Sequence, residues 1–574
     1  MIVSPASRSP LGGTLRRLAA ARPPWLVVGC ATLAAALLFL VGLHNHTLWD
    51  YHEPYVGGIV HEMATRGEWV VPTLNGQPYL EKPPLFYLMA VLCCRAAGDF
   101  APWALPLPSA LMAIGTVAWV SWLGCRLQSA RAGLWAGLLT ATDVLFFQMG
   151  HQAVVDMTLT ATVTLSLGLA FLALTEERSR PWLDGFWASL GLVFLAKGVV
   201  GPVMVLWPVA AALAFLGDRR KTAAFLRPTW GMAVGLGLAL AWVVPLAMKG
   251  GREFLTEVFV RNSLGRFLKH PDLVSRTGRL EEHREPLYFY LERSPGNLCP
   301  WLALWIAAMV PARARRGVAA WGIPLLFLAT LVLLSVSSGK RMVYLLPVLP
   351  ITFLQTAFWT DRVLDEGPGR AARLALWTTL VLTFLLSVGL PWLAVDRGGM
   401  PWAMALPMSL VSLAMGTAAL GLALRRRLAG ALAWCMAQWA AAVLVFGVLA
   451  VPYMDREWNP LLEPYQVARR LEDLGAGVHQ GNLGETQIGF INLVLGHQVP
   501  AAKTESEVRE VLARNGPEVV LVESIHFWRR DLRGRVEGGL EIPTQAGQSR
   551  KLWDRAPVVV VNQSALDLLE DEDN

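Results

Sequence analysis

Charged residues are scarce in this chain of 574 residues: 16% are Asp, Glu, Lys or Arg, whereas 54% are hydrophobic. Soluble globular proteins carry roughly a quarter charged residues, so this composition excludes an ordinary soluble enzyme and predicts a polytopic membrane protein. The net charge of +7 would suggest a polyanionic partner in a soluble protein, but here the basic residues fall in short clusters between apolar runs. Such clusters report orientation in a membrane, and we therefore expect no nucleic-acid partner.

Cysteine is also rare, and the six cysteines lie in or beside apolar segments without a metal-ligand spacing. We interpret them as buried thiols. The sequence shows no internal repeat and no low-complexity linker. No small-residue cleavage site follows the first apolar run, which comes after several arginines, so this run is predicted to be an uncleaved span with a cytoplasmic N-terminus.

Apolar runs predict a helical membrane domain of about 13 transmembrane helices over residues 1–452. The predicted spans are 25–43, 103–125, 132–150, 157–175, 183–200, 201–217, 229–248, 299–312, 318–336, 342–360, 375–395, 401–424 and 429–450. The segment 85–98 is short for a span and is predicted to be an interfacial helix. The basic clusters between spans then face the cytoplasm, and the loops near 44–102 and 249–298 face outward.

Residues 453–574 lack long apolar runs and are predicted to form a small α/β domain on the outer, periplasmic side. Segments 465–474 and 505–515 have a helical pattern, and 518–524 and 558–561 read as short buried strands. The acidic end is expected to be a frayed tail. These features predict a multi-pass, monomeric protein of a bacterial inner membrane.

Polar residues gather in the first outer loop. Asp50 and Glu53 follow the first span, and Glu81 and Lys82 precede two prolines. Hydration at the end of a span explains any one carboxylate equally well. Their concentration in one loop favours a functional site.

Further ionisable residues lie inside or beside later apolar runs. Asp156 starts a predicted span, and an ionisable group at that depth is a functional hypothesis by default. Lys197 lies near the end of another span, where snorkelling to the interface is the alternative explanation. Lys340 and Arg341 lie outside with Tyr344, against the positive-inside tendency, and a bound anion would explain cations there.

The second outer loop carries Arg266 and His283, and a lone loop histidine is more often a surface residue than a metal ligand. Carboxylates and cations at an outer membrane face suit sugar transfer from a lipid phosphate. A carboxylate can deprotonate the acceptor hydroxyl while cations stabilise the departing phosphate.

Motifs in this order carry a resemblance to a known family: HEP, EKPPLFY, VVDMTLT, FLAKGVVGP, EHREPLYFY and SSGKRMVYLLP. Together they resemble the bacterial protein O-mannosyltransferase and aminoarabinose transferase family, membrane glycosyltransferases of the GT-C class. The resemblance covers nearly the whole chain and includes the C-terminal domain. It implies an inverting transferase that moves a sugar from a polyprenyl-phosphate donor, such as undecaprenyl phosphate, to lipid A, a glycan or a protein.

The resemblance also implies roles for individual residues. Asp50, Glu53 and Asp156 would be catalytic; Lys82, Lys197, Lys340 and Tyr344 would hold the donor phosphate, and the loop cation Arg266 is grouped with them; Glu81 and His283 would hold a divalent metal ion, zinc, magnesium or manganese. In two places the sequence departs from the family pattern. His52 occupies the position of the family's first-loop Asp, so either Asp50 or Glu53 would take over its role, and Pro106 stands where relatives often have Arg.

Two other classes remain open on the sequence alone. A lipid-linked-sugar flippase or transporter would also have many spans with buried charges, although the chain lacks repeated halves. A structural scaffold would leave Asp156, Lys197 and Lys340 without a role. The sequence identifies neither the sugar nor the acceptor.

Overall fold

The structure is a computed structural model of the chain. It describes residues 23–45, 53–98, 100, 103–176, 179–265, 285–310, 318–337, 339–456, 459–481, 483–502, 504–523, 540–542 and 557–573.

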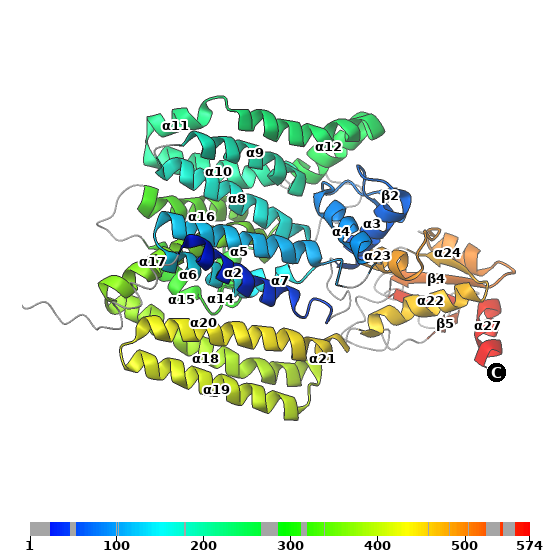
Figure 1. Cartoon of the computed structure of the whole chain (residues 1–574). Helices are drawn as coiled ribbons and strands as arrows, with labels where there is room; N and C mark the ends of the chain where they lie inside the picture. The colour runs from blue at the N-terminus through cyan, green and yellow to red at the C-terminus, as the bar shows by residue number, and fades with distance from the viewer. Residues whose placement is uncertain are drawn as a thin grey trace, which may run out of the picture.

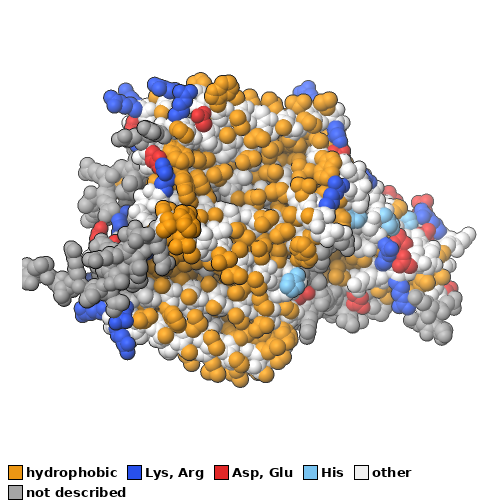
Figure 2. Space-filling view, viewed as in Figure 1, with side chains coloured by type: hydrophobic (Ala, Val, Ile, Leu, Met, Phe, Trp, Pro, Cys, Tyr) orange, Lys and Arg blue, Asp and Glu red, His pale blue; other side chains and the backbone are white. Residues whose placement is uncertain are grey.

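A bundle of helices forms most of the described chain up to residue 456 (Figure 1). Within the described residues, 7 helices are long and apolar enough to cross a membrane, or up to 8 if one bent pair counts as a single span. These spans are Leu107–Leu127, Val155–Thr175, Trp230–Ser263, Met342–Glu366, Arg370–Arg397, Trp402–Leu424 and Leu428–Tyr453. An apolar belt covers the middle of the bundle, and charged side chains gather toward its two ends (Figure 2). The predicted polytopic helical architecture is confirmed, while the larger number of spans stays a prediction.

Other helices of the bundle are shorter or less apolar. They include α2 (Pro24–Leu40), α9 (Arg180–Lys197), α10 (Val200–Leu216), α14 (Phe289–Asn297), α15 (Leu302–Met309) and α16 (Val318–Val336). The predicted span at 299–312 is represented by α15, which has only 8 residues. That helix is too short to cross a bilayer by itself, because a spanning helix needs about 20 residues.

Helix α8 (Val155–Thr175) lies deepest in the bundle, since 83% of its apolar window is buried. Thr160 and Thr162 donate to the carbonyls of Asp156 and Thr158 at 2.7 and 2.9 Å. These hydroxyls therefore find partners within their own helix and can be buried at little cost. Helix α9 follows α8 after a short connection and packs against it. Consequently the last residue of α9, Lys197, returns to the end of the bundle where α8 begins.

The predicted span at 132–150 is broken in the structure. It consists of α6 (Ala130–Ala141) and α7 (Val144–Gly150), whose axes differ by 66°. Asp143 lies at the break, and its carboxylate accepts a hydrogen bond from the Phe146 amide at 3.0 Å. An Asp in this position favours starting a new helix over continuing the old one. The predicted span at 132–150 is therefore represented by two helices with a bend between them, which together are long and apolar enough to count as one span.

A small outer layer follows α2 in the chain and consists of α3 (Glu53–Arg66), the strands β1 (Thr73–Leu74) and β2 (Gln77–Pro78), and α4 (Leu85–Ala97). Asn75 and Gly76 join the strands with positive φ angles of 48° and 73°, as a two-residue Asn-Gly hairpin requires. The 13 residues of α4 pack against α3 in a shared apolar cluster. This arrangement fits the predicted short interfacial helix.

The last part of the chain forms a four-stranded sheet with strand order β3-β4-β6-β5. Its strands are β3 (Gly477–Gln480), β4 (Glu518–Glu523), β5 (Leu540–Ile542) and β6 (Pro557–Val561), of which β3 and β4 are parallel. Its helices are α22 (Glu463–Asp473), α23 (Glu485–Val494), α24 (Glu505–Leu512) and α27 (Gln563–Asp573). The predicted helices and strands are found here. The acidic end, however, is helical in α27 and is not the expected frayed tail.

The outer layer joins the sheet domain to the bundle (Figure 1). Helix α23 crosses α3 so closely that a Cβ atom on Gly489 would lie 2.3 Å from the Pro54 carbonyl carbon. Further along both helices, Asn492 donates to the Glu62 carboxylate at 2.6 Å. The two helices therefore run in the same direction, and only glycine fits where they cross.

Candidate functional site

The candidate site lies where the outer layer meets the ends of α8 and α9. The Lys82 ammonium donates to the Tyr55 hydroxyl at 2.7 Å, and its nitrogen lies 5.0 Å from the centre of that ring. The prolines after Lys82 fix this loop, and the turn after α9 reaches it: a Cβ atom on Gly198 would lie 3.9 Å from Pro83. Lys82 is thus held beside the end of α9, and its predicted role in holding the donor phosphate stays a prediction.

Asp156 and Lys197 form an ion pair in which the Lys197 ammonium donates to the carboxylate at 2.5 Å. Their side chains are 11% and 18% exposed, so the pair is largely shielded from water. The Lys197 nitrogen also lies 4.8 Å from the centre of the Tyr344 ring. Asp156, Lys197 and Tyr344 are therefore brought together from three separate segments. Lys197 faces a carboxylate and an aromatic ring and does not simply snorkel into the interface.

Glu53 is fully buried at the start of α3. Its carboxylate accepts a hydrogen bond from the Ala153 amide at 2.8 Å, which ties the outer layer to the segment before α8. This contact positions Tyr55, two residues later, next to the Asp156 end of α8. Glu53 thus has a clear structural role, and its predicted catalytic role stays a prediction.

The segment from Lys340 to Tyr344 supplies two neighbouring cations with different partners. The buried Lys340 ammonium donates to the Glu285 carbonyl at 2.9 Å. Arg341 contributes to the electrostatic field at Tyr55. Sequence reasoning gave the donor role to Lys340, and the structure adds Arg341 as a cation near the cluster.

Glu81 accepts a hydrogen bond from the Tyr79 hydroxyl at 3.3 Å. Across the described part of the chain, no group of three or more His, Cys, Asp or Glu side chains is arranged to hold a metal ion. The described donors at Glu81 therefore do not form a metal site by themselves, because a resident ion normally takes three or four ligands. The second predicted ligand, His283, lies outside the described residues, as do Asp50, His52 and Arg266.

The electrostatics of Tyr55 identify its neighbours. Burial raises the pKa of Tyr55 well above its usual range, the carboxylates of Glu485, Glu81 and Asp156 raise it further, and Arg341 lowers it. Charges from four separate segments therefore act on one phenol. Sequence reasoning missed Tyr55 and Glu485. No sequence pattern distinguishes Tyr55 from the other aromatic residues near it, and none links residue 485 to the outer loops.

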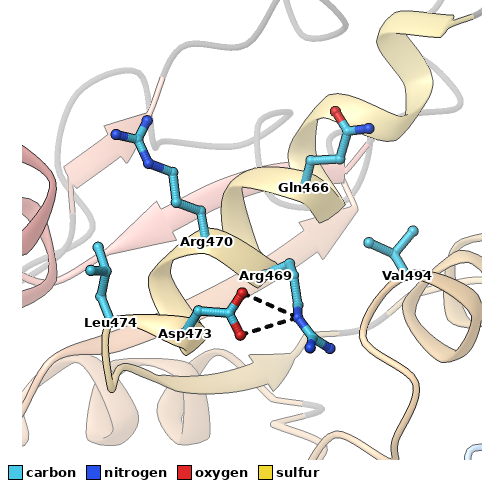
Figure 3. Close-up of a pocket in the computed structure, with 6 residues that line it drawn as sticks. All are labelled: Gln466, Arg469, Arg470, Asp473, Leu474 and Val494. Carbon is cyan, nitrogen blue, oxygen red and sulfur yellow. Dashed lines mark hydrogen bonds and ion pairs between the residues drawn. The ribbon is translucent and has the colours of Figure 1, made fainter. Parts of the chain in front are cut away.

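A surface hollow of about 300 Å³ on the sheet domain is a different place. It is lined by α22 and α23 residues, among them Arg469 and Asp473, which form an ion pair at 3.2 Å (Figure 3). It includes none of the predicted site residues. The hollow is therefore separate from the charged cluster around Tyr55, which is the candidate site.

Comparison with known proteins finds similar sequences and a similar fold. The family described as dolichyl-phosphate-mannose-protein mannosyltransferase matches residues 81–248, which include Glu81, Lys82, Asp156 and Lys197. An undecaprenyl phosphate-alpha-4-amino-4-deoxy-L-arabinose arabinosyl transferase of Yersinia enterocolitica is 27% identical over 58% of this chain and 59% of its own length. A transferase of the same name from Pseudomonas fluorescens is 28% identical over 65% of this chain and 64% of its own length. The chain thus matches less than two thirds of the length of these relatives.

The fold matches over a longer region. The crystal structure of ArnT from Cupriavidus metallidurans bound to undecaprenyl phosphate superposes with a TM-score of 0.72, covering 94% of this chain and 98% of that chain at 18% identity. The chain therefore has the same fold as that protein. The sequence matches are to the mannosyltransferase and aminoarabinose transferase proteins that the motifs of this chain resemble.

Proposed function

We propose that this protein is an inverting glycosyltransferase that moves a sugar from a polyprenyl-phosphate carrier to an acceptor on the outer face of the membrane. The observation that carries the proposal is the convergence of Lys82, Lys197, Arg341 and Asp156 around Tyr55. Its relatives are named for transfer from undecaprenyl phosphate-linked 4-amino-4-deoxy-L-arabinose, which makes an amino sugar the first donor to test.

The reaction replaces one bond to the anomeric carbon with another. The acceptor oxygen attacks that carbon from the face opposite the phosphate, the carbon–oxygen bond to the phosphate breaks, and the configuration inverts. Asp156, which forms an ion pair with Lys197, takes the acceptor proton as the general base. Lys82, Lys197 and Arg341 stabilise the negative charge that develops on the departing lipid phosphate, assisted by Lys340, Tyr344 and Arg266.

The proposal also covers the membrane location and topology of the enzyme, its acceptor and its metal ion. The chain would be a monomer in a bacterial inner membrane, with about 13 spans in residues 1–452, a cytoplasmic N-terminus and a periplasmic domain at 453–574. Lipid A is the first acceptor to test, with glycans and proteins as the alternatives. Either Asp50 or Glu53 would assist Asp156 at the acceptor side, and Glu81 with His283 would hold a divalent metal ion if one is bound.

The test follows both halves of the donor. Purified protein in vesicles receives a polyprenyl-phosphate sugar labelled in the sugar and in the lipid, together with lipid A. We expect release of free lipid phosphate in equal amount to the sugar transferred, in wild type and in the control variant Asp396→Asn, which changes an exposed carboxylate on α18 (Arg370–Gly398). Translocation of an intact donor without release would instead identify a flippase. Mass spectrometry of envelope lipids and glycoproteins from cells with and without the chain identifies the acceptor.

A further inference from the structure

A small cavity of about 210 Å³ lies between the outer layer and the sheet domain. The end of α23 and the segment after it line one side, and the last turns of α3 line the other with His61, Glu62, Thr65 and Arg66. The lining residues have polar side chains, apart from one glycine, and none of them belongs to the candidate site. Pockets for drug-sized ligands measure about 300–1,000 Å³, so this cavity suits a smaller, polar molecule.

The walls of the cavity are held in place by bonds across the seam between the two parts. Glu62 is buried, and its carboxylate accepts from the Thr73 hydroxyl at 2.6 Å and from the Gly76 amide at 3.0 Å. The tip of the hairpin binds the opposite wall, because Asn75 donates to the Val499 carbonyl and accepts from its amide, both at 3.0 Å. The cavity is therefore a fixed feature of the docked sheet domain.

A buried acceptor in the cavity wall lacks a donor. Asn492 lines the cavity and is 1% exposed, and its amide nitrogen donates to the Glu62 carboxylate at 2.6 Å. That bond fixes the orientation of the amide, because the reverse orientation would place two oxygens against each other. The Asn492 Oδ1 atom has no hydrogen-bond partner among the described residues. Such an atom costs free energy, so a ligand with a hydroxyl donor would bind favourably here.

The charges around the cavity favour a neutral ligand over an anion or a metal ion. Burial lowers the pKa of His61, an effect that the Glu62 carboxylate opposes, so this imidazole is uncharged at neutral pH and offers one donor and one acceptor. His497 is paired with Glu472 at 2.5 Å, which leaves the exposed Arg66 beside the buried Glu62. One cation next to one carboxylate does not make an anion site. In the described part of the chain, no cluster of three His, Cys, Asp or Glu side chains is available for a metal ion.

Planar polar groups at the edge of the cavity suit the hydroxyls of a sugar ring. The Gln498 amide and the Arg66 guanidinium each present two polar groups in one plane, a geometry that can bond two neighbouring hydroxyls. The Thr65 hydroxyl donates to the His61 carbonyl at 2.9 Å and is left as an acceptor. The cavity thus offers a mixture of donors and acceptors, as a polyhydroxylated ring requires.

We propose that this cavity binds one uncharged sugar unit and is a saccharide site separate from the site of transfer. A ring hydroxyl donates to Asn492 Oδ1, while Gln498 and Arg66 bond adjacent hydroxyls. Glu62 lies seven residues after Tyr55 on α3, about 10 Å along the helix, which separates the cavity from the charged cluster. The sugar is the head group of a glycolipid or part of a soluble glycan, since both present the same hydroxyls. The inference does not depend on the proposed transferase function.

The experiment measures sugar binding to the full-length protein in nanodiscs by ligand-detected NMR, with methyl α-glucoside as the probe. We expect a Kd of about 1 mM, as for other ligands of this size with a few hydrogen bonds. Thr65→Trp fills the cavity from its exposed edge and should abolish binding, and Gln498→Ala should weaken binding by about three- to tenfold. Glu510→Trp, which adds the same side chain at an exposed position of α24, is the matched control and should bind like the wild type.

Further measurements identify the source of the sugar and separate binding from folding. Nanodiscs that contain glucosyl diacylglycerol should lower the methyl glucoside signal if the source is a lipid head group, and leave it unchanged if the source is a soluble glycan. Thermal unfolding of each variant shows whether the protein remains folded. Inorganic phosphate should not displace the sugar. Displacement by phosphate, full binding in folded Thr65→Trp, or no binding of the glucoside by the wild type overturns the inference, and release of lipid phosphate from the donor tests the transferase function independently.

Discussion

The Asp156–Lys197 pair gives a prediction in which stability and chemistry can be measured separately. Asp156→Asn keeps the shape of the side chain but no longer neutralises Lys197, whose ammonium lies 2.5 Å from the native carboxylate. Removing one partner of a buried ion pair costs about 3 to 5 kcal/mol. Because the two side chains retain 11% and 18% exposure, we expect the lower end, about 3 kcal/mol.

The double variant Asp156→Asn/Lys197→Met tests the coupling. Removing both charges leaves no unpaired ion, so its destabilisation should be smaller than the sum of the single effects by up to about 3 kcal/mol. Transfer should not recover with stability, because the acceptor proton still lacks its carboxylate. We expect turnover to fall by about 10²- to 10⁴-fold in both variants that lack Asp156.

Thermal unfolding in detergent measures the first effect, and release of labelled lipid phosphate under donor saturation measures the second. Asp396→Asn again serves as the control. If the double variant transferred sugar at the wild-type rate, Asp156 would act only by neutralising Lys197, and the reasoning that makes it the base would be refuted.

Three further predictions concern the surroundings of this pair. Lys340→Met should raise the donor KM by about tenfold; an unchanged KM in donor saturation would limit Lys340 to its bond with the Glu285 carbonyl. Gly489→Ala places a Cβ atom 2.3 Å from the Pro54 carbonyl carbon, and should loosen α23 by about 1 to 3 kcal/mol, seen as faster hydrogen exchange in that helix. Elemental analysis of protein purified without metal-affinity steps should find a divalent ion in wild type and less in Glu81→Gln; finding none in wild type would remove the proposed metal.

The parts that sequence predicted well depend on composition and local period. Long apolar runs predicted the membrane bundle, and the alternation of short helices and buried strands predicted the sheet domain. Both patterns are local, because they depend on which side chains of each segment are buried. The break at Asp143 was missed since a single carboxylate inside an apolar run barely changes its mean hydropathy. Its consequence, a new helix start, depends on one side-chain bond to Phe146.

The sequence also predicted which charged residues inside apolar runs are candidates for a site. Burying such a charge costs free energy, and a function or a partner must offset that cost. Asp156 and Lys197 were both selected in this way. The ion pair between them was not predicted, because it depends on the start of α8 and the end of α9 lying at the same end of the bundle. The partners of Lys340 and Arg341 could not be predicted from the sequence either. They are adjacent cations in one motif, and only the structure directs Lys340 to Glu285 while Arg341 acts on Tyr55.

The residues that sequence reasoning missed belong to contacts between distant segments. Tyr55 is ordinary as an aromatic residue near a membrane interface, and Glu485 is ordinary as the first residue of a soluble helix. Their proximity depends on Gly489, whose missing side chain lets α23 approach the backbone of Pro54. A carboxylate more than 400 positions from Tyr55 thereby acts on its hydroxyl, and also on those of Tyr79 and Tyr87. The charge of the C-terminal domain therefore acts on the candidate site through Glu485.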